Sequence, residues 1–251
     1  MQLHPLAAQF DSIADAYERG RPAYGPGVVG LVAAELGLSP GDPVLDLGAG
    51  TGKLTRALVA FGLEVTAVEP QPALRGLLAA AVGPQRVREG VAEAIPLADG
   101  SVAAVTAADA FHWFETDVAL AEVARVLRPG GALVRLTSAV DWAGASWAHE
   151  VGTLISGLRP DHPNFGGPSW EQSLRLAGGW EQPRELGVSF PHSPSRERIL
   201  DHIVSISWMA GLPEDQRAET LQRIGELIDA GETPEQMLVR VSILMAGRTV
   251  G

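Results

Sequence analysis

The sequence predicts an α/β fold: a doubly wound, mostly parallel seven-stranded sheet with helices on both faces and additional helical cap elements. Two observations lead to this prediction. Short apolar segments alternate with helical patterns between residues 28 and 138, and such alternation gives a parallel sheet covered by helices. The segment 44–47 also runs directly into a loop with glycines at 48, 50 and 52. Strand-to-helix turns of this kind are where such sheets bind ligands.

Glycine, proline and polar residues separate the elements of this core. We expect helices over 28–38, 53–61, 72–82 and 116–127, and strands over 43–47, 64–69, 86–89, 102–108 and 132–138. Proline in the first turn favours the helix that begins at residue 72. The last helix has apolar residues at helical spacing, and Arg128-Pro-Gly-Gly131 is expected to end it.

The alternation ends after residue 138. Residues 141–185 hold four of the six tryptophans, and the proline- and glycine-rich segment 159–168 is expected to be a loop. Helices over 195–209 and 214–229 and a closing strand over 237–246 are expected to follow.

Composition excludes several classes of protein. The chain has 251 residues, a net charge of −11 and no cysteine. Nucleic acids favour basic partners, so this charge argues against a nucleic-acid ligand, and neither disulfides nor cysteine-ligated zinc can form. The chain begins without a signal-peptide pattern and has no apolar stretch of about 18 residues. We therefore expect a cytoplasmic protein that does not enter a membrane.

Residues 46–52, Asp-Leu-Gly-Ala-Gly-Thr-Gly, carry the strongest functional signal. Glycine allows the backbone to approach a ligand closely, and a helix that begins just after the loop directs unpaired N–H groups at it. Glu69 lies 21 residues after Gly48, at the end of the next apolar segment. A doubly wound sheet places an acid there to bind the ribose hydroxyls of a nucleotide-like cofactor.

The glycine spacing disfavours dinucleotides and simple phosphates. A dinucleotide motif needs its third glycine three residues after the second, and Lys53 occupies that position. Leu54 stands where a phosphate-binding Gly-Lys motif has Ser or Thr. The negative charge of Asp46 would repel a pyrophosphate, whereas it suits a ligand with positive charge.

The pattern Asp46-x-Gly-x-Gly-x-Gly52 resembles the first motif of the class I S-adenosylmethionine-dependent methyltransferases. Nearly the whole chain resembles small-molecule methyltransferases of the type 11 group, and is most similar to trans-aconitate methyltransferase-like enzymes. The resemblance implies a Rossmann-like methyltransferase fold with S-adenosyl-L-methionine as cofactor. It also implies a single domain over 1–251, with a cofactor-covering segment (1–27), a cofactor-binding core (28–138), and a substrate cap with C-terminal sheet strands (139–251).

Four further segments carry the resemblance. Residues 10–24 resemble the segment that covers the cofactor, 90–96 the stretch that meets adenine, 110–114 the motif beside the reacting methyl group, and 128–131 the turn into the fifth strand. The cofactor contacts implied are Tyr17, Asp46, Gly48, Ala49, Gly50, Gly52, Glu69, Pro70, Ala92, Glu93, Ala108 and Asp109. Many relatives have an acid near position 92, so the partner of the adenine amine is expected to be Glu93 or backbone alone.

His112 is the candidate catalytic residue. Methyl transfer is an in-line displacement that depends mainly on positioning and desolvation. A carboxylate acceptor needs no base, whereas a phenol, alcohol or amine could lose its proton to a nearby histidine. The alternative is a histidine that shapes the wall of the pocket.

The candidate substrate-binding residues are aromatic or cationic. Arg21 could bind an anionic substrate through two parallel hydrogen bonds, and tryptophans could line a pocket for a flat or lipophilic acceptor. The alternative for each is simple packing in the core or on the sheet. The full set is Arg21, Tyr24, Trp113, Trp142, Trp147 and Trp208. No histidines or acids have the spacing of a metal site, so no metal is expected.

These features predict methyl transfer from S-adenosylmethionine (EC 2.1.1.-) to an O-, N- or C-nucleophile of a small molecule, such as a carboxylate or a secondary metabolite. Two alternatives stay open. One is an enzyme of another class that uses the same cofactor for cyclisation, elimination or rearrangement. The other is a non-catalytic protein that binds the cofactor as a partner of another protein. The sequence leaves the oligomeric state open.

Overall fold

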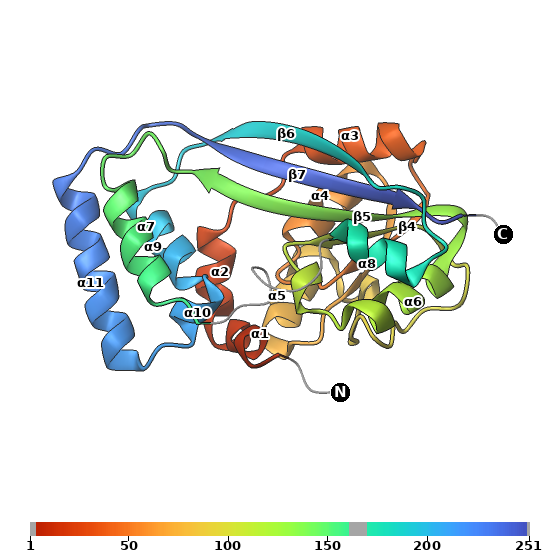
Figure 1. Ribbon diagram of the computed structural model, residues 1–251, viewed down its shortest axis with the longest axis horizontal. Coiled ribbons are helices and arrows are strands. Elements are labelled where there is room, and N and C mark those ends of the chain that lie inside the picture. Colours follow the sequence, from red (N-terminus) through yellow and green to blue (C-terminus); the bar gives the residue numbers. More distant parts are fainter. Residues whose placement is uncertain (1–3, 161–169, 250–251) are drawn as a thin grey trace. The chain divides into compact units, whose positions relative to one another are not determined.

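A computed structural model describes residues 4–160 and 170–249 of the chain (Figure 1). The contacts divide the chain into two compact units. Unit 1 comprises the described residues within 1–22, 139–165 and 189–240, and unit 2 those within 23–138, 166–188 and 241–251. The single domain with three functional segments stays a prediction.

One sheet of seven strands forms the framework, in the order β3-β2-β1-β4-β5-β7-β6. β1 pairs in parallel with β2 and β4, β2 with β3, and β4 with β5. The strands are β1 (Pro43–Leu47), β2 (Glu64–Val68), β3 (Val87–Arg88), β4 (Val102–Ala108), β5 (Leu127–Asp141), β6 (Arg184–His192) and β7 (Met237–Gly247). The predicted doubly wound, mostly parallel sheet is confirmed. The strand order reverses at β1 and β4, where such sheets bind their ligands.

The helices of unit 2 flank its part of the sheet (Figure 1). They bury their apolar faces, as Leu58 of α4 and Leu120 of α6 illustrate, against strands whose central side chains are almost inaccessible to solvent. Burial on both faces is typical of parallel sheets. The helical segments are α3 (Pro26–Leu36), α4 (Lys53–Phe61), α5 (Pro72–Val82), η2 (Pro84–Arg86), η3 (Phe111–Trp113), α6 (Thr116–Val126) and α8 (Trp170–Ala177).

Unit 1 joins helices that are far apart in sequence. Helix α2 packs on α9 so closely that a Cβ atom at Gly20 would lie 2.2 Å from the backbone nitrogen of His202. Only glycine allows this approach, and Arg19 pairs with Asp201 beside it at 2.7 Å. The helical segments are α1 (Pro5–Ala8), η1 (Gln9–Ile13), α2 (Ala14–Gly20), α7 (Ala148–Gly157), α9 (Arg196–Val204), α10 (Ser207–Ala210) and α11 (Glu214–Ala230).

The predicted continuous helix over 195–209 is wrong. The chain breaks between α9 and α10, because Ile206 adopts an extended conformation with φ −74° and ψ 127°. The hydroxyl of Ser205 donates to the carbonyl of His202 at 2.6 Å and accepts a hydrogen bond from Nε of Arg21 at 2.7 Å. A tertiary contact therefore holds the break, which the helical pattern could not reveal.

Helix α6 ends at Val126, next to the predicted stop at 128–131, but the strand predicted to begin at residue 132 begins earlier. Strand β5 begins at Leu127, which pairs with Val102, and the register then shifts so that Ala132 pairs with Ala104. Residues 128–131 therefore form an irregularity inside the strand, with Gly130 at φ +76°. Such bulges keep a strand paired around extra residues.

Strand β6 and helices α7 and α8 were not predicted from the sequence. β6 lies at the end of the strand order, and its residues are only exposed or half-buried. The sequence analysis overlooked the apolar residues at alternate positions, Leu186, Val188 and Phe190, which are the half-buried side of this strand. Most of the predicted loop 159–168 lies outside the described residues. Within the described ranges, no helix has the length and apolar character needed to cross a bilayer.

Candidate functional site

The loop between β1 and α4 depends on three glycines. Gly48, Gly50 and Gly52 have φ values of +67°, +57° and +87°, a region that side chains with a Cβ atom rarely adopt. The N–H groups of Gly48 and Ala49 donate to the carbonyl of Val68 at 2.9 and 3.1 Å. The loop is therefore anchored to the end of the neighbouring strand β2.

Two of these glycines also lie against neighbouring side chains. A Cβ atom at Gly48 would lie 2.8 Å from Cβ of Ala110, and one at Gly52 would lie 2.7 Å from Cδ1 of Leu78. Both distances are shorter than real contacts allow. Space as well as backbone conformation therefore requires glycine at these positions.

Glu69 follows β2 and is buried. Its Oε2 accepts a hydrogen bond from the N–H of Gly50 at 2.8 Å, and its Oε1 accepts one from the N–H of Gln71 at 3.0 Å. Burial raises the pKa of Glu69 to about 7, and the two N–H groups oppose this shift only partly. The structure thus brings the predicted acid and the glycine loop into direct contact.

Arg75 of α5 fixes the segment that carries Glu69. Its Nη1 donates to the carbonyls of Glu69 and Pro70 at 3.0 and 2.7 Å, and its Nη2 pairs with the exposed Glu89 at 2.9 Å. A side chain of the following helix α5 therefore fixes the backbone of Pro70, one of the predicted contact residues.

Asp46 lies within β1 and is fully buried. Its carboxylate accepts hydrogen bonds from the hydroxyls of Thr55 at 2.6 Å and Thr106 at 3.0 Å. Burial raises its pKa to about 6, against the opposing effect of both hydroxyls. Asp46 therefore ties β1 to β4 and to the first turn of α4. The sequence analysis missed both threonines, although Thr106 is the one hydroxyl in the otherwise apolar run 102–108.

Asp109 follows Ala108, the last residue of β4, and is the one non-glycine residue with positive φ (51°) among those that the structure describes. Its carboxylate accepts from the backbone N–H and hydroxyl of Ser138 at 2.9 and 2.5 Å, and from the hydroxyl of Tyr24 at 3.0 Å. Two predicted site residues are thus bonded to each other. Backbone strain of this kind clusters at functional sites.

The segment after β4 forms the short helix η3. Phe111 is buried and packs edge-on against Trp170 of α8, with ring centroids 4.7 Å apart. The half-buried His112 and Trp113 lie beside this anchor, with ring centroids 4.6 Å apart. The sequence analysis did not include Trp170, because nothing in its spacing connects it to residues 110–114.

The stretch predicted to meet adenine makes a tight turn. Val91 bridges to Ala94, and between them Ala92 is buried while Glu93 is half-buried. Oε1 of Glu93 accepts a hydrogen bond from the N–H of Glu115 at 2.7 Å. The turn is therefore attached to the start of α6.

Unit 1 holds the other predicted residues. Nε and Nη2 of Arg21 donate to the hydroxyl and carbonyl of Ser205 at 2.7 and 3.1 Å, and its guanidinium lies 5.6 Å from the centre of the Tyr17 ring. Burial and the charge of Arg21 lower the pKa of His202 to about 3. His202, which the sequence analysis missed, is therefore neutral at physiological pH.

Two of the three predicted tryptophans of unit 1, Trp142 and Trp147, lie side by side. The ring of Trp142 lies 5.5 Å from that of Trp147 and 5.4 Å from that of His202, between centroids. Nε1 of the buried Trp147 donates to Thr233 at 2.8 Å. Nε1 of Trp208 donates to the carbonyl of Ile155 at 3.1 Å. Across 4–160 and 170–249, no three histidines or acids are grouped as metal ligands, and the absence of a metal stays a prediction.

Comparison with known proteins gives one consistent result. Residues 45–135 match the family of methyltransferase domains. The chain is 36% identical over 223 residues to the uncharacterized methyltransferase Rv3342 of Mycobacterium tuberculosis, covering 89% of this chain and 86% of that protein. The structure of a candidate type II methyltransferase from Anaeromyxobacter dehalogenans has a TM-score of 0.58 at 25% identity, covering 91% of this chain and 97% of that one. The 4+2 cyclase SpnF shares the fold, with a TM-score of 0.51 at 20% identity over 92% and 84% of the two chains.

Proposed function

Because the chain belongs to the class I S-adenosylmethionine-dependent methyltransferases, we propose that it methylates a small molecule and that unit 2 holds the cofactor with residues 48–52 and Glu69. Membership confirms the family predicted from residues 46–52, whereas the likeness to trans-aconitate methyltransferases is only a loose comparison. The hydrogen bond from Gly50 to Glu69 carries the proposal. It joins the loop that would hold the methionine half to the acid that would hold the ribose.

The environment of Glu69 fits the cofactor. Its buried carboxylate has lost the solvation that favours the ionised form, and two backbone N–H groups replace it only partly. Two ribose hydroxyls would donate to the remaining acceptor positions of this carboxylate. The three glycines beside it allow the loop backbone to approach the ligand closely. S-adenosylmethionine, when bound, supplies an electrophilic methyl group.

The other residues of unit 2 take positioning roles in this proposal. Asp46 holds the base of the loop in place, because its carboxylate accepts hydrogen bonds from Thr55 at the start of α4 and from Thr106 of β4. The turn at Ala92 and Glu93 meets adenine. His112 takes the proton of a phenol, alcohol or amine acceptor, or forms the pocket wall for a carboxylate acceptor that needs no base.

Arg21 suggests an anionic acceptor. The hydrogen bonds of its guanidinium go to the neutral hydroxyl and carbonyl of Ser205. A half-buried cation whose hydrogen-bond partners are neutral favours an anionic ligand. R21Q should raise the KM for an acidic acceptor more than it changes kcat, with little effect on the amide analogue of that acceptor.

Calorimetry tests cofactor binding. The wild type should bind S-adenosylmethionine and S-adenosylhomocysteine, and G50V should lose this binding because a branched side chain would be forced into the left-handed region beside Glu69. The matched control is G76V: Gly76 is helical, and an added Cβ meets nothing within 4 Å. Normal binding by G50V would show that the loop assignment is wrong.

Mass spectrometry tests the reaction. Incubation with a library of small acids, phenols and amines should yield S-adenosylhomocysteine and a product that has gained a methyl group. The second candidate is an enzyme that binds the cofactor for a cyclisation, elimination or rearrangement, a use that the shared fold of SpnF makes worth testing. It predicts an isomerised or cleaved product with unchanged cofactor. A non-catalytic partner protein predicts binding without any product.

A further inference from the structure

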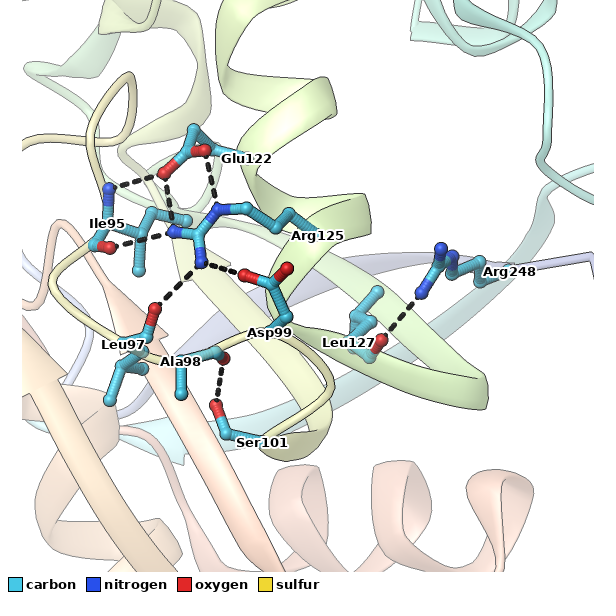
Figure 2. Close-up of polar contacts among 9 residues, drawn as sticks. All are labelled: Ile95, Leu97, Ala98, Asp99, Ser101, Glu122, Arg125, Leu127 and Arg248. Atoms are coloured by element: carbon cyan, nitrogen blue, oxygen red, sulfur yellow. Dashed lines mark hydrogen bonds and ion pairs between the residues drawn. The ribbon is translucent and has the colours of Figure 1, made fainter.

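The guanidinium of Arg125, on α6, uses all of its hydrogen-bond donors (Figure 2). Nε donates to Oε1 of Glu122 at 2.7 Å. Nη1 donates to the carbonyl of Leu97 at 2.8 Å and to Oδ1 of Asp99 at 2.7 Å. Nη2 donates to the carbonyl of Ile95 at 2.9 Å and to Oε2 of Glu122 at 2.7 Å. A guanidinium has five N–H groups, so each of them has an acceptor.

Glu122 completes the attachment of the loop to α6. Its Oε2 also accepts a hydrogen bond from the N–H of Ile95 at 2.9 Å, so side chains of α6 bind both backbone groups of Ile95 (Figure 2). The backbone carbonyl of Arg125 accepts from the N–H of Gly100 at 2.9 Å. The side chains of Glu122 and Arg125 thus satisfy backbone N–H and C=O groups of the loop, which in a sheet would be satisfied by a neighbouring strand.

The same loop begins with the turn that contains Ala92 and Glu93. Glu93 is bonded to the N–H of Glu115, just before the first residue of α6. Three parts of the loop are therefore attached to α6 or to the residue just before it. These are the start of the loop through Glu93, its middle through Ile95 and Leu97, and its end through Gly100.

We infer that Arg125 is a positioning residue for adenine recognition: together with Glu122 it fixes the loop whose turn at Ala92 and Glu93 faces the adenine ring. This inference rests on the proposed function, because the turn has this role only if S-adenosylmethionine binds to unit 2. Arg125 acts through the loop backbone and makes no contact with the cofactor itself.

The solvent exposure of each partner indicates how strongly its interaction with Arg125 holds the loop. The side chain of Asp99 is 80% exposed, whereas those of Arg125 and Glu122 are 30% and 22% exposed. Exposed ion pairs contribute little. The hydrogen bonds from Arg125 lower the pKa of Glu122, which stays ionised. D99N is therefore a matched control that alters the exposed contact and leaves the bonds to Ile95 and Leu97 in place.

R125K is the informative variant. Lysine keeps the positive charge and a similar aliphatic stem, but its single nitrogen cannot reach Glu122, Leu97 and Ile95 in the geometry of the planar fork. The turn should then lose its fixed position while the rest of the sheet is unchanged.

The experiment compares S-adenosylhomocysteine with S-inosylhomocysteine, in which a carbonyl replaces the adenine amine. Calorimetry should show that the wild type prefers S-adenosylhomocysteine by about tenfold, the effect of one recognised polar group. R125K should bind S-adenosylhomocysteine about tenfold more weakly and prefer it by less than about threefold. D99N should match the wild type within about twofold in both measurements.

Three outcomes would overturn the inference: a wild type without preference, an R125K protein with wild-type affinity and preference, or an R125K protein that binds both ligands equally more weakly and keeps the preference. A wild type that binds neither ligand would instead refute the cofactor assignment. If R125K fails to fold, E122Q takes its place in the same comparison. Hydrogen exchange at the Ile95 amide should be faster in E122Q than in the wild type, and an equal rate would count against the attachment.

Discussion

The buried carboxyl group of Glu69 is expected to make cofactor affinity depend on pH. Burial raises its pKa to about 7 in the free protein. Ribose hydroxyls donate hydrogen bonds, so they bind the ionised form better than the protonated form, which has lost an acceptor. Binding therefore lowers the pKa of Glu69 and releases a proton. Affinity should rise as the pH rises through 7.

The size of the effect follows from this pKa. A group with a pKa of about 7 is roughly one-tenth ionised at pH 6 and roughly nine-tenths ionised at pH 8. The Kd for S-adenosylhomocysteine should therefore be about tenfold higher at pH 6 than at pH 8. Calorimetry at pH 6 in two buffers of different ionisation enthalpy should also show the release of nearly one proton for each cofactor bound.

Two variants identify the group responsible. E69Q should bind more weakly, because an amide nitrogen would oppose the N–H of Gly50 or Gln71, and its affinity should not change between pH 6 and pH 8. E89Q is the control: Glu89 is an exposed acid on the far side of Arg75, and its loss should leave the pH dependence intact. A wild-type Kd that is constant between pH 6 and pH 8, or an E69Q protein that keeps the wild-type slope, would refute the reasoning.

Three further predictions concern the same unit. The pKa of Asp46 is raised from 3.8 to about 6, so its folded form holds a proton that the unfolded chain releases; stability should be greatest below pH 4 and fall as the pH rises through 6. Urea unfolding should show that the wild type loses about 2 kcal/mol relative to D46N between pH 4 and pH 8, which is most of the roughly 3 kcal/mol that a shift of about two pKa units is worth. A constant difference would contradict the assignment. G48A, with φ +67° and a Cβ atom 2.8 Å from Ala110, should lose at least about 1 kcal/mol of stability and bind cofactor more weakly, whereas G76A should be neutral or more stable. H112A should reduce kcat by about 100-fold or more if His112 is an essential base, and a loss below about tenfold would leave only the pocket-wall role.

Local signals in the sequence predicted most of the parallel core. Strands β1 and β4 and helices α4 and α5 begin and end at the predicted residues. Glycine or proline marks these boundaries, except at the end of β4, where the apolar run stops at the polar residue Asp109. The break between α9 and α10 depends on a distant contact instead, because Arg21 binds Ser205 from another part of the chain. Strand β6 does have a local signal, the alternate apolar residues Leu186, Val188 and Phe190, but the run is short and only half-buried, and the sequence analysis overlooked it.

The candidate site divides in the same way. The glycine loop and Glu69 are close in sequence, so the β-α-β connection alone brings them together. Two partners of the acids at the strand ends are distant in sequence: Thr106 is 60 residues from Asp46, and Ser138 is 29 residues from Asp109. Only the register of adjacent strands shows these pairs. A lone hydroxyl in an apolar strand was the available clue for Thr106, and no comparable clue pointed to Ser138.

The close approach of Gly20 to the backbone of α9 has a consequence for biosynthesis. Helix α2 leaves the ribosome before residues 196–204, which supply part of its packing surface. At about 5–20 residues per second, roughly 10–40 s separate the emergence of the two helices. During that interval the apolar side chains of Ile13 and Ala14, buried in the finished protein, have no native cover. The segment that contains η1 and α2 therefore exposes apolar side chains to aggregation or chaperone binding until residues 196–204 have emerged.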